Sequence, residues 1–269
     1  MQQSSQSPVS RRQLLQSAGL ATVGAVMAGT SSATIAAEAN PEPVSAKNLR
    51  GLMSALQANV GRRDFREVPM ILTDPSDWDD KALKLLFAYA GQPKEIFDNT
   101  DLFGPWLNLM RNTMNAMVYA WKQPDFLATS ATHGPAAMAL YDQHVWDKYN
   151  LPGFIARKLD KKIDRNAFIE EKSVAKASAD DVQNETGPFS AVGNNIPALQ
   201  RRGVVFLACH NAIWELSEAL MKSGHNPDKL SHGQLAADLT NHLVEGAVLT
   251  PGILATVAVM QRNGFHYVI

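Results

Sequence analysis

The stretch GVVFLACHNAIWELSEALMKSG, residues 203–224, decides the fold class. Its first seven residues are an unbroken apolar run, which is typical of a strand buried on both faces of a parallel sheet. In the segment that follows at once, Ile213, Leu216 and Leu220 recur at helical spacing, and Gly224 is a natural helix stop. A strand that leads directly into a helix is the repeating element of an α/β protein.

The same alternation runs along most of the chain. Predicted strands occupy residues 94–98, 125–132, 203–209, 247–250 and 265–269, and predicted helices occupy residues 77–90, 105–121, 136–149, 212–223, 230–243 and 253–263. Asp77 and Ser231 are expected to cap two of these helices. Strands separated by such helices predict a mainly parallel sheet covered on both faces, which is a three-layer α/β/α sandwich.

The composition excludes several classes of protein. The chain has 269 residues, of which 45% are apolar and 19% charged, with a formal net charge of −1. This is a globular composition without the basic excess of nucleic-acid-binding proteins, so no nucleic-acid partner is expected. No GxGxxG or GxxxxGK[ST] fingerprint is present, and a single cysteine provides neither a disulfide nor a Cys-pair metal site. The sequence therefore predicts no cofactor.

Residues 1–39 resemble a twin-arginine (Tat) signal peptide. Arg11 and Arg12 precede a mildly apolar stretch rich in Ala and Gly, and Ala37-Glu38-Ala39 is a plausible cleavage site. The apolar stretch is short for a membrane span, which needs about 20 residues. We expect the Tat machinery to export the folded protein to the periplasm; the alternatives are an uncleaved anchor or a disordered N-terminus.

The remainder divides into an N-terminal region and one domain. Residues 40–76 are polar and are interpreted as an arm or linker that contains a short helix within 45–61. Residues 77–269 are expected to form the α/β domain. Within it, residues 157–200 are charged and then rich in Asn, Gly, Ser and Pro, which predicts an inserted excursion with little core of its own.

Three of the predicted strands end in distinctive residues. The three segments are Thr132-His133-Gly134-Pro135, Ala208-Cys209-His210-Asn211 and Thr250-Pro251-Gly252. Sites in open α/β sheets lie beyond the carboxyl ends of the strands, where helix N-termini also present free backbone amides. These segments are therefore expected to meet at one edge of the sheet.

Cys209 has two interpretations. At a strand-to-helix junction, the amides and dipole of the helix N-terminus stabilise a thiolate, and His210 adds a polar neighbour. Alternatively, Cys209 is a small buried packing residue. His133 is a candidate acid/base, a metal ligand or a turn-capping residue, and Asn211 is a candidate helix N-cap. A copper or zinc site built from Cys209, His210 and His133 is conceivable, but the spacing has no diagnostic value, so no metal is predicted.

Residues 94–269 resemble the DsrE-like family, which includes the DsrE/DsrF and TusD/YchN-type proteins of sulfur relay. The matching segments are HGPA at 133–136, GVVFLACHN at 203–211, GAVLTPG at 246–252 and MQRNGFHYVI at 260–269. Each segment alone is weak, but their order and spacing agree with the family apart from the long excursion before residue 203.

The resemblance implies an α/β/α sandwich with a mainly parallel sheet, assembled into homo-oligomers such as trimers or hexamers. In sulfur-transferring members, a cysteine carries a persulfide and passes it to a protein partner, and Cys209 matches a cysteine common at the end of this strand. The known sulfur-relay members act in the cytoplasm, whereas this chain has an export signal.

These observations lead to one main hypothesis. Cys209 and His133 are the expected catalytic residues of an exported sulfur carrier, and the expected substrate-binding residues are His210, Asn211, Gly134, Thr250 and Gly252. The alternatives are an oligomeric binding protein with a buried Cys209 and a periplasmic metal binder.

Overall fold

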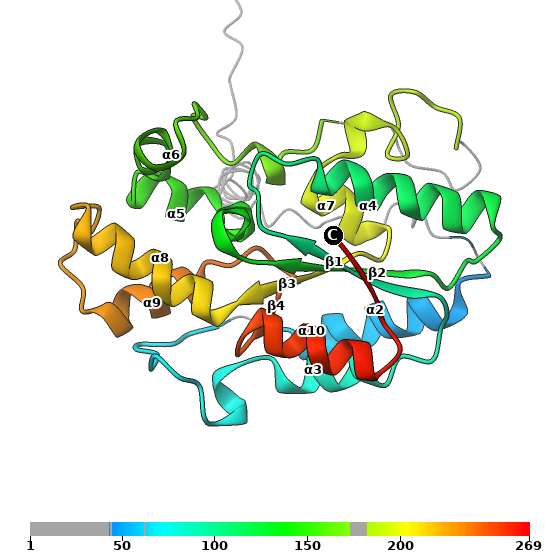
Figure 1. The fold of residues 1–269 in the computed structure, drawn as a ribbon, viewed down its shortest axis with the longest axis horizontal. Coiled ribbons are helices and arrows are strands. Elements are labelled where there is room, and N and C mark those ends of the chain that lie inside the picture. The colour runs from blue at the N-terminus through cyan, green and yellow to red at the C-terminus, as the bar shows by residue number, and fades with distance from the viewer. Residues whose placement is uncertain (1–42, 44, 62, 173–181) are drawn as a thin grey trace, which may run out of the picture. The chain divides into compact units, whose positions relative to one another are not determined.

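The computed structural model describes residues 43, 45–61, 63–172 and 182–269. The predicted signal peptide, with Arg11 and Arg12, lies outside these residues. The centre of the fold is a five-stranded sheet in the order β4-β3-β2-β1-β5, in which every pairing is parallel (Figure 1). The strands are β1 (Lys94–Asn99), β2 (Leu127–Thr132), β3 (Val205–Cys209), β4 (Val248–Thr250) and β5 (His266–Val268).

Burial on both faces of the sheet accounts for the unbroken apolar run of β3. All residues of β2 and β3 are buried, because each strand has a neighbour on both sides and helices on both faces. In contrast, β5 is an edge strand whose first two residues are exposed. The fold-class prediction, an α/β sandwich with a parallel sheet, is confirmed.

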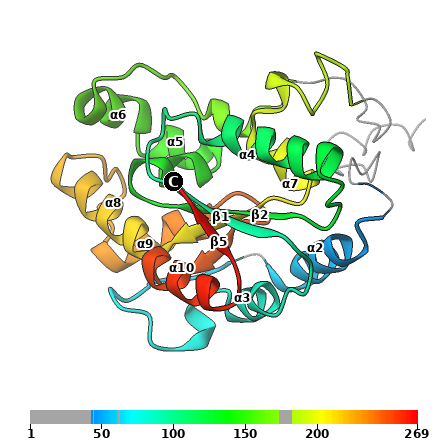
Figure 2. The ribbon, with the colours of Figure 1, turned by 45° about the vertical axis from the view of Figure 1, so that its right-hand side comes forward.

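Three helices cover one face of the sheet: α2 (Lys47–Asn59), α3 (Asp80–Phe87) and α10 (Ile253–Arg262) (Figures 1 and 2). Leu49, Leu52 and Leu56 are buried along one side of α2 and pack in a core cluster with α3 and α10. The predicted short helix within 45–61 is therefore present. The region expected to be an arm or linker contributes this helix to the core.

The other helices share the second core cluster, on the opposite face. They are α4 (Trp106–Asn115), α5 (Gln143–Lys148), α6 (Leu151–Leu159), α7 (Ile196–Arg201), α8 (His210–Lys222) and α9 (His232–Asn241). A π-helical turn, Ala116–Ala120, continues α4. Short 3₁₀ turns occur at Pro75–Asp77, Gly134–Leu140, Ala167–Ile169 and Ala191–Gly193. Figure 1 shows α8 extending outward from the end of β3, with α9 beside it.

The first domain helix begins later than predicted. Asp77 ends a 3₁₀ turn that Asp74 caps through Ser76 N–H, and the residue before α3 is Asp79. The Asp79 carboxylate caps no helix; it pairs with Arg63 and accepts the backbone N–H of Leu249. The prediction for Asp77 was wrong because tertiary contacts of Asp79 position the start of the helix.

The helix predicted over 136–149 is divided in two. Gly134–Leu140 is a 3₁₀ helix, Tyr141 is extended and forms an antiparallel bridge with Leu243, and α5 begins after Asp142. The side chain of Asp142 accepts Val145 N–H, which starts the new helix. By contrast, the prediction for Ser231 is confirmed: it forms a reciprocal capping box with Gln234 at the start of α9.

The described parts of the 157–200 excursion contribute more to the core than predicted. Ile196 and Leu199, on α7, are fully buried in the second core cluster. Asn166 is also fully buried, and its side-chain amide donates to the carbonyls of Ala139 and Tyr141. No helix among the described residues is long and apolar enough to cross a membrane.

Candidate functional site

Cys209 ends β3 and lies directly before α8. Its side chain points to the face covered by α10 and is only 6% exposed. The backbone N–H of Ile253, the first residue of α10, donates to the Cys209 sulfur at 3.4 Å. The sulfur therefore lies at the N-termini of two helices, one of which donates to it directly, and helix N-termini favour negative charge.

Three of the predicted binding residues lie around the ends of β3 and β4: Thr250, Asn211 and Gly252. Thr250 pairs with Cys209 in the β3–β4 register, but its hydroxyl donates to the carbonyl of Ala208 and is not directed at the sulfur. Asn211 is exposed in the first turn of α8, and an added Cβ at Gly252 would lie 3.1 Å from its amide nitrogen. The N-cap position belongs to Cys209, so the prediction that Asn211 caps the helix was wrong. Gly252 leaves room for Asn211 near the start of α10.

His210 faces away from this group. It is 1% exposed, its Nε2 lies 2.8 Å from the carbonyl oxygen of Pro69, and its Nδ1 has no hydrogen-bond partner among the described residues. Burial lowers the pKa of His210, opposed by its contacts with the carbonyls of Pro69 and Met70. His210 is therefore a buried, neutral histidine, and its hydrogen bond to Pro69 holds the segment that precedes α3.

Acidification is expected to destabilise the protein through His210. Because its folded pKa is lowered, the unfolded state binds the proton first as the pH falls below about 6.5, and the free energy of unfolding declines from there towards the folded pKa. Urea denaturation at a series of pH values measures this decline. The decline should be shallower in His210→Gln and unchanged in His144→Gln, whose side chain is exposed. Equal declines in the wild type and His210→Gln would contradict this role.

His133, at the end of β2, belongs to a cluster that the sequence did not predict. Its Nε2 lies 2.7 Å from Oδ1 of Asp98, at the end of β1, and the Tyr267 hydroxyl of β5 donates to the other oxygen of Asp98. The side chains of His133 and Asp98 are 20% and 15% exposed. We call these three residues the Asp98 cluster. It lies between β1 and β5, where the strand order reverses, which is the place where ligands bind in open α/β sheets.

Cys209 and the Asp98 cluster lie on the same face of the sheet. Ala131 and Cys209 both pack in the core cluster that includes α10, and His133 follows Ala131 by two residues, which returns it to that face. Asp98 is paired in register with Ala131. Four consecutive strands of the sheet, β3, β2, β1 and β5, therefore carry in turn the thiol of Cys209, the imidazole of His133, the carboxylate of Asp98 and the phenol of Tyr267.

The Asp98 carboxylate determines the tautomer of His133. An ionised carboxylate only accepts hydrogen bonds, so Nε2 of His133 carries the proton and Nδ1 keeps its lone pair. No described residue binds Nδ1. The hydrogen bond to Asp98, and then desolvation, raise the pKa of Tyr267, which keeps this phenol a donor. The arrangement can accept a proton at Nδ1.

Gly134 has a structural reason for its identity. It is exposed, and its φ of +54° is favourable for glycine and strained for other residues. Its position lets the chain turn sharply after His133 into the 3₁₀ helix Gly134–Leu140.

Asp98, Tyr267 and the Ile253 amide were missed in the sequence. Asp98 had a usable signal, since it is a polar residue at the end of a predicted strand, where sites are expected. Tyr267 had none, because the position of the last strand beside β1 follows from the crossover of α10 and is not visible in the local pattern.

A buried phenol belongs to the core cluster on the opposite face of the sheet from Cys209. Tyr141 is fully buried, and its hydroxyl has no hydrogen-bond partner among the described residues. Burial, and then the charge of a Cys209 thiolate, raise the pKa of Tyr141. The interior near Cys209 thus contains a free O–H donor.

The geometry does not support the metal hypothesis. The His210 imidazole contacts Pro69, and His133 is bound to Asp98. Within the described part of the chain, no three His, Cys, Asp or Glu side chains gather closely enough to bind a metal ion.

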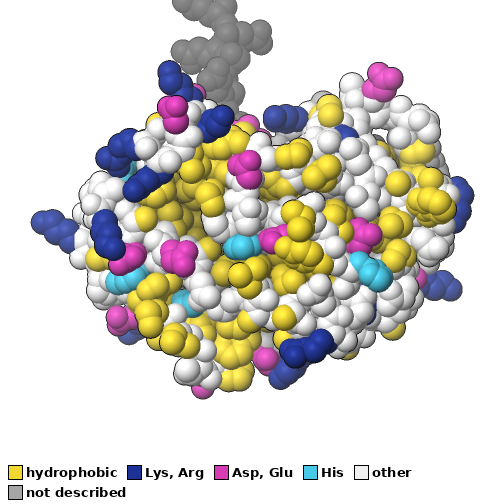
Figure 3. All heavy atoms as spheres, in the orientation of Figure 1, with side chains coloured by type: hydrophobic (Ala, Val, Ile, Leu, Met, Phe, Trp, Pro, Cys, Tyr) yellow, Lys and Arg dark blue, Asp and Glu magenta, His cyan; other side chains and the backbone are white. Residues whose placement is uncertain are grey.

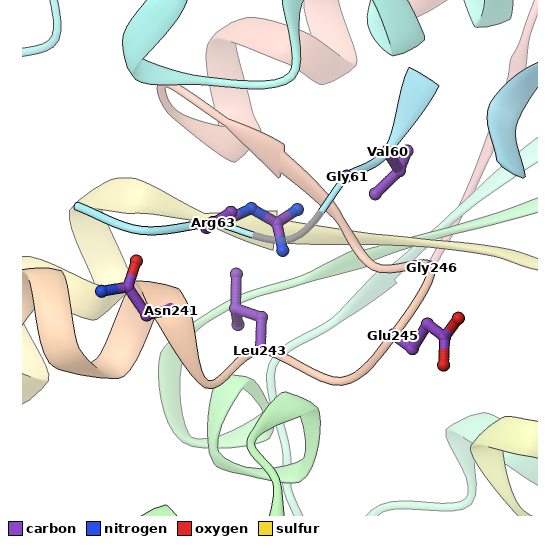
Figure 4. A pocket seen from close by; sticks show the side chains of 7 residues that line it. All are labelled: Val60, Gly61, Arg63, Asn241, Leu243, Glu245 and Gly246. Atoms are coloured by element: carbon purple, nitrogen blue, oxygen red, sulfur yellow. The ribbon is translucent and has the colours of Figure 1, made fainter. Parts of the chain in front are cut away.

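A hollow of about 280 Å³ lies elsewhere, near the start of β4 (Figure 4). Its described lining is Val60, Gly61, Arg63, Asn241, Leu243, Glu245 and Gly246. Figure 4 shows Arg63 and Leu243 pointing toward one another, while Glu245 points away. The Arg63 guanidinium is already bound to Asp79 and the carbonyl of Ala247. None of the predicted site residues is among the described residues that line this hollow.

The surface near the end of β5 is apolar. Figure 3 shows hydrophobic side chains gathered where Figure 1 places the C-terminus, with acidic and histidine side chains beside them. Tyr267 and Ile269 are both exposed there. The Asp98 cluster therefore lies beside exposed apolar side chains.

No family model matches the chain, and comparisons with curated proteins and with solved structures found no match either. Fold and site define the class: an α/β sandwich with a helix-bound thiol and a carboxylate-bound histidine at the carboxyl edge of a parallel sheet.

Proposed function

We propose that this chain is an exported DsrE-like protein that carries sulfane sulfur as a persulfide on Cys209. The observation that carries the proposal is the position of the sulfur, which accepts the N–H of Ile253 at the start of α10. Backbone donors at a helix N-terminus favour the thiolate, which is the form that reacts with sulfane sulfur. The parallel α/β sandwich and the sequence resemblance support the same proposal.

The chemistry requires no cofactor. The Cys209 thiolate attacks the outer sulfur of a donor R–S–SH, forming Cys–S–SH and releasing R–S⁻. An acceptor thiolate then attacks the outer sulfur of Cys–S–SH, takes it up as R′–S–SH and regenerates the Cys209 thiolate. His133 accepts the thiol proton at Nδ1, and the Ile253 amide stabilises the sulfur anion. A cysteine that is only 6% exposed suits a small donor.

Sulfur loading is tested by intact mass. The protein, freed of reductant, is incubated with polysulfide and its mass is measured before and after treatment with dithiothreitol. We expect one added sulfur atom on the wild type, reversed by the dithiol, and none on Cys209→Ser. Absence of added sulfur on the wild type, or equal loading of Cys209→Ser, would refute the proposal.

The burial of Cys209 favours a second candidate function, a non-catalytic binding protein in which the thiol only packs. Its sulfur lies in the core cluster with Leu207, Ile253 and Val257. Titration of the native protein with a thiol reagent distinguishes the two functions. A thiol that reacts in the native state supports the carrier, and one that reacts only after denaturation supports the binding protein.

A further inference from the structure

Two arginines are buried in the layer of helices on the face opposite to Cys209. Arg111 lies on α4, and Arg202 directly follows α7. They are 7% and 4% exposed. Figures 1 and 2 show α4 and α7 side by side above the sheet, with α3 and α10 below it. Buried arginines are rare unless their charge is paired.

The groups that accept hydrogen bonds from these guanidinium groups are neutral amide oxygens. Nη2 of Arg111 donates to the side-chain oxygens of Asn108 and Asn112, at 2.8 and 2.6 Å. Nη2 of Arg202 donates to the side-chain oxygen of Asn115, at 2.6 Å. These bonds orient both groups, but they do not neutralise either charge.

Each guanidinium retains donors without acceptors. Nε and Nη1 of Arg111, and Nη1 of Arg202, are buried and have no hydrogen-bond partner in the described structure. Neither arginine forms an ion pair with a described carboxylate, whereas the adjacent Arg201 pairs with Glu171. An unpaired buried N–H costs free energy, and an unpaired buried charge costs more.

The two positive charges also repel each other. The pKa of Arg202 is lowered to about 10, mainly by burial; Tyr119 opposes this shift and the Arg111 charge adds to it. Burial likewise lowers the pKa of Arg111. The local field is therefore uncompensated and positive.

We propose that Arg111 and Arg202 form a binding site for a small divalent oxyanion of the sulfate, thiosulfate or phosphate type. Two cations call for two negative charges, and the planar fork of each guanidinium matches the oxygens of such an anion. Together the two groups offer three unpaired donor nitrogens to the oxygens of such an anion. This site is distinct from the sulfur site, which lies on the other face of the sheet.

Aromatic and amide side chains surround the two guanidinium groups. The guanidinium of Arg202 lies 4.8 Å from the centre of the Phe189 ring, and Tyr119 packs edge-on against the same ring. The side-chain amide of Asn194 donates to Asn108, while its oxygen is buried without a partner. The unpaired nitrogens are closed off from solvent, and Phe189 and Asn194 lie against the two guanidinium groups and their amide partners.

The test is thermal unfolding of the full chain in sodium sulfate, with sodium chloride at equal ionic strength as the reference. At sulfate concentrations far above the dissociation constant, we expect the wild-type melting temperature to rise by roughly 5 °C relative to chloride. Arg111→Met and Arg202→Met should lose this rise, while Arg66→Met, which removes an exposed arginine, should keep it. Parallel titrations with thiosulfate and phosphate identify the preferred anion.

A second measurement covers variants that do not fold. Equilibrium dialysis of the wild type against radiolabelled sulfate should show one bound anion per chain, displaced by unlabelled sulfate. No saturable binding, or an equal sulfate-induced rise in Arg111→Met and the wild type, would overturn the proposal.

Discussion

Replacing Trp146 with alanine is expected to lower the free energy of unfolding by about 3–5 kcal/mol. Trp146 is the largest fully buried side chain among the described residues, and its indole N–H donates to the carbonyl of Met138 at 2.9 Å. The substitution leaves a large cavity and removes one of the two hydrogen bonds that the Met138 carbonyl accepts, the other coming from Tyr141 N–H, and both losses act together. Since domains are stable by only about 5–15 kcal/mol, the loss is a large part of the total.

Loss of Trp146 is also expected to affect the segment that follows His133. Met138 belongs to the 3₁₀ helix Gly134–Leu140 that directly follows His133, so the hydrogen bond from Trp146 on α5 holds this helix in place. Urea denaturation followed by circular dichroism measures the loss. Trp121→Ala is the matched control, because Trp121 is 71% exposed and its removal should change stability by less than about 1 kcal/mol. Similar losses in both variants would contradict the burial argument.

The strands were predictable because the sequence encodes burial directly. β3 is an unbroken apolar run because helices cover it on both faces, and β2 is a run of small residues, LATSAT, that is buried throughout. Ser231 was predictable as an N-cap because its partner Gln234 is three residues away. Local signals of this kind depend only on nearby residues.

The errors share a different cause. The first domain helix starts at Asp80 because Asp79 bonds to Arg63 and Leu249, which are distant in sequence. The helix predicted over 136–149 breaks because Tyr141 pairs with Leu243. Contacts between residues so far apart leave no periodic trace in the sequence.

The same difference between local and distant signals applies to the candidate site. Strand ends indicated Cys209 and His133, since that rule needs only the strand assignments. The bond from Asp98 to His133 depends on the β1–β2 register, and the bond from Tyr267 depends on the return of β5 beside β1. Fold class was therefore easier to predict than the partners of the site residues.

Replacing Asp98 with asparagine is expected to slow the sulfur loading of Cys209 roughly 10²-fold, the usual contribution of a positioned base. In the wild type, the carboxylate accepts from Nε2 of His133 and leaves Nδ1 free to accept a proton. An asparagine that turns its NH₂ towards His133 forces the proton onto Nδ1, and the base is lost. The initial rate of persulfide formation, measured by mass at low polysulfide concentration, reports this effect.

The tautomer of His133 can be measured directly by NMR. This measurement shows whether Asp98 positions the His133 proton, independently of the sulfur loading rate. The ¹⁵N shifts of the His133 imidazole should show a proton on Nε2 in the wild type and on Nδ1 in Asp98→Asn. Asp101→Asn is the matched control, since Asp101 is exposed and its carboxylate accepts the backbone N–H of Phe103. If Asp98→Asn keeps the wild-type tautomer and loading rate, Asp98 does not position His133. If the tautomer changes while the loading rate does not, His133 is correctly oriented but accepts no proton from Cys209.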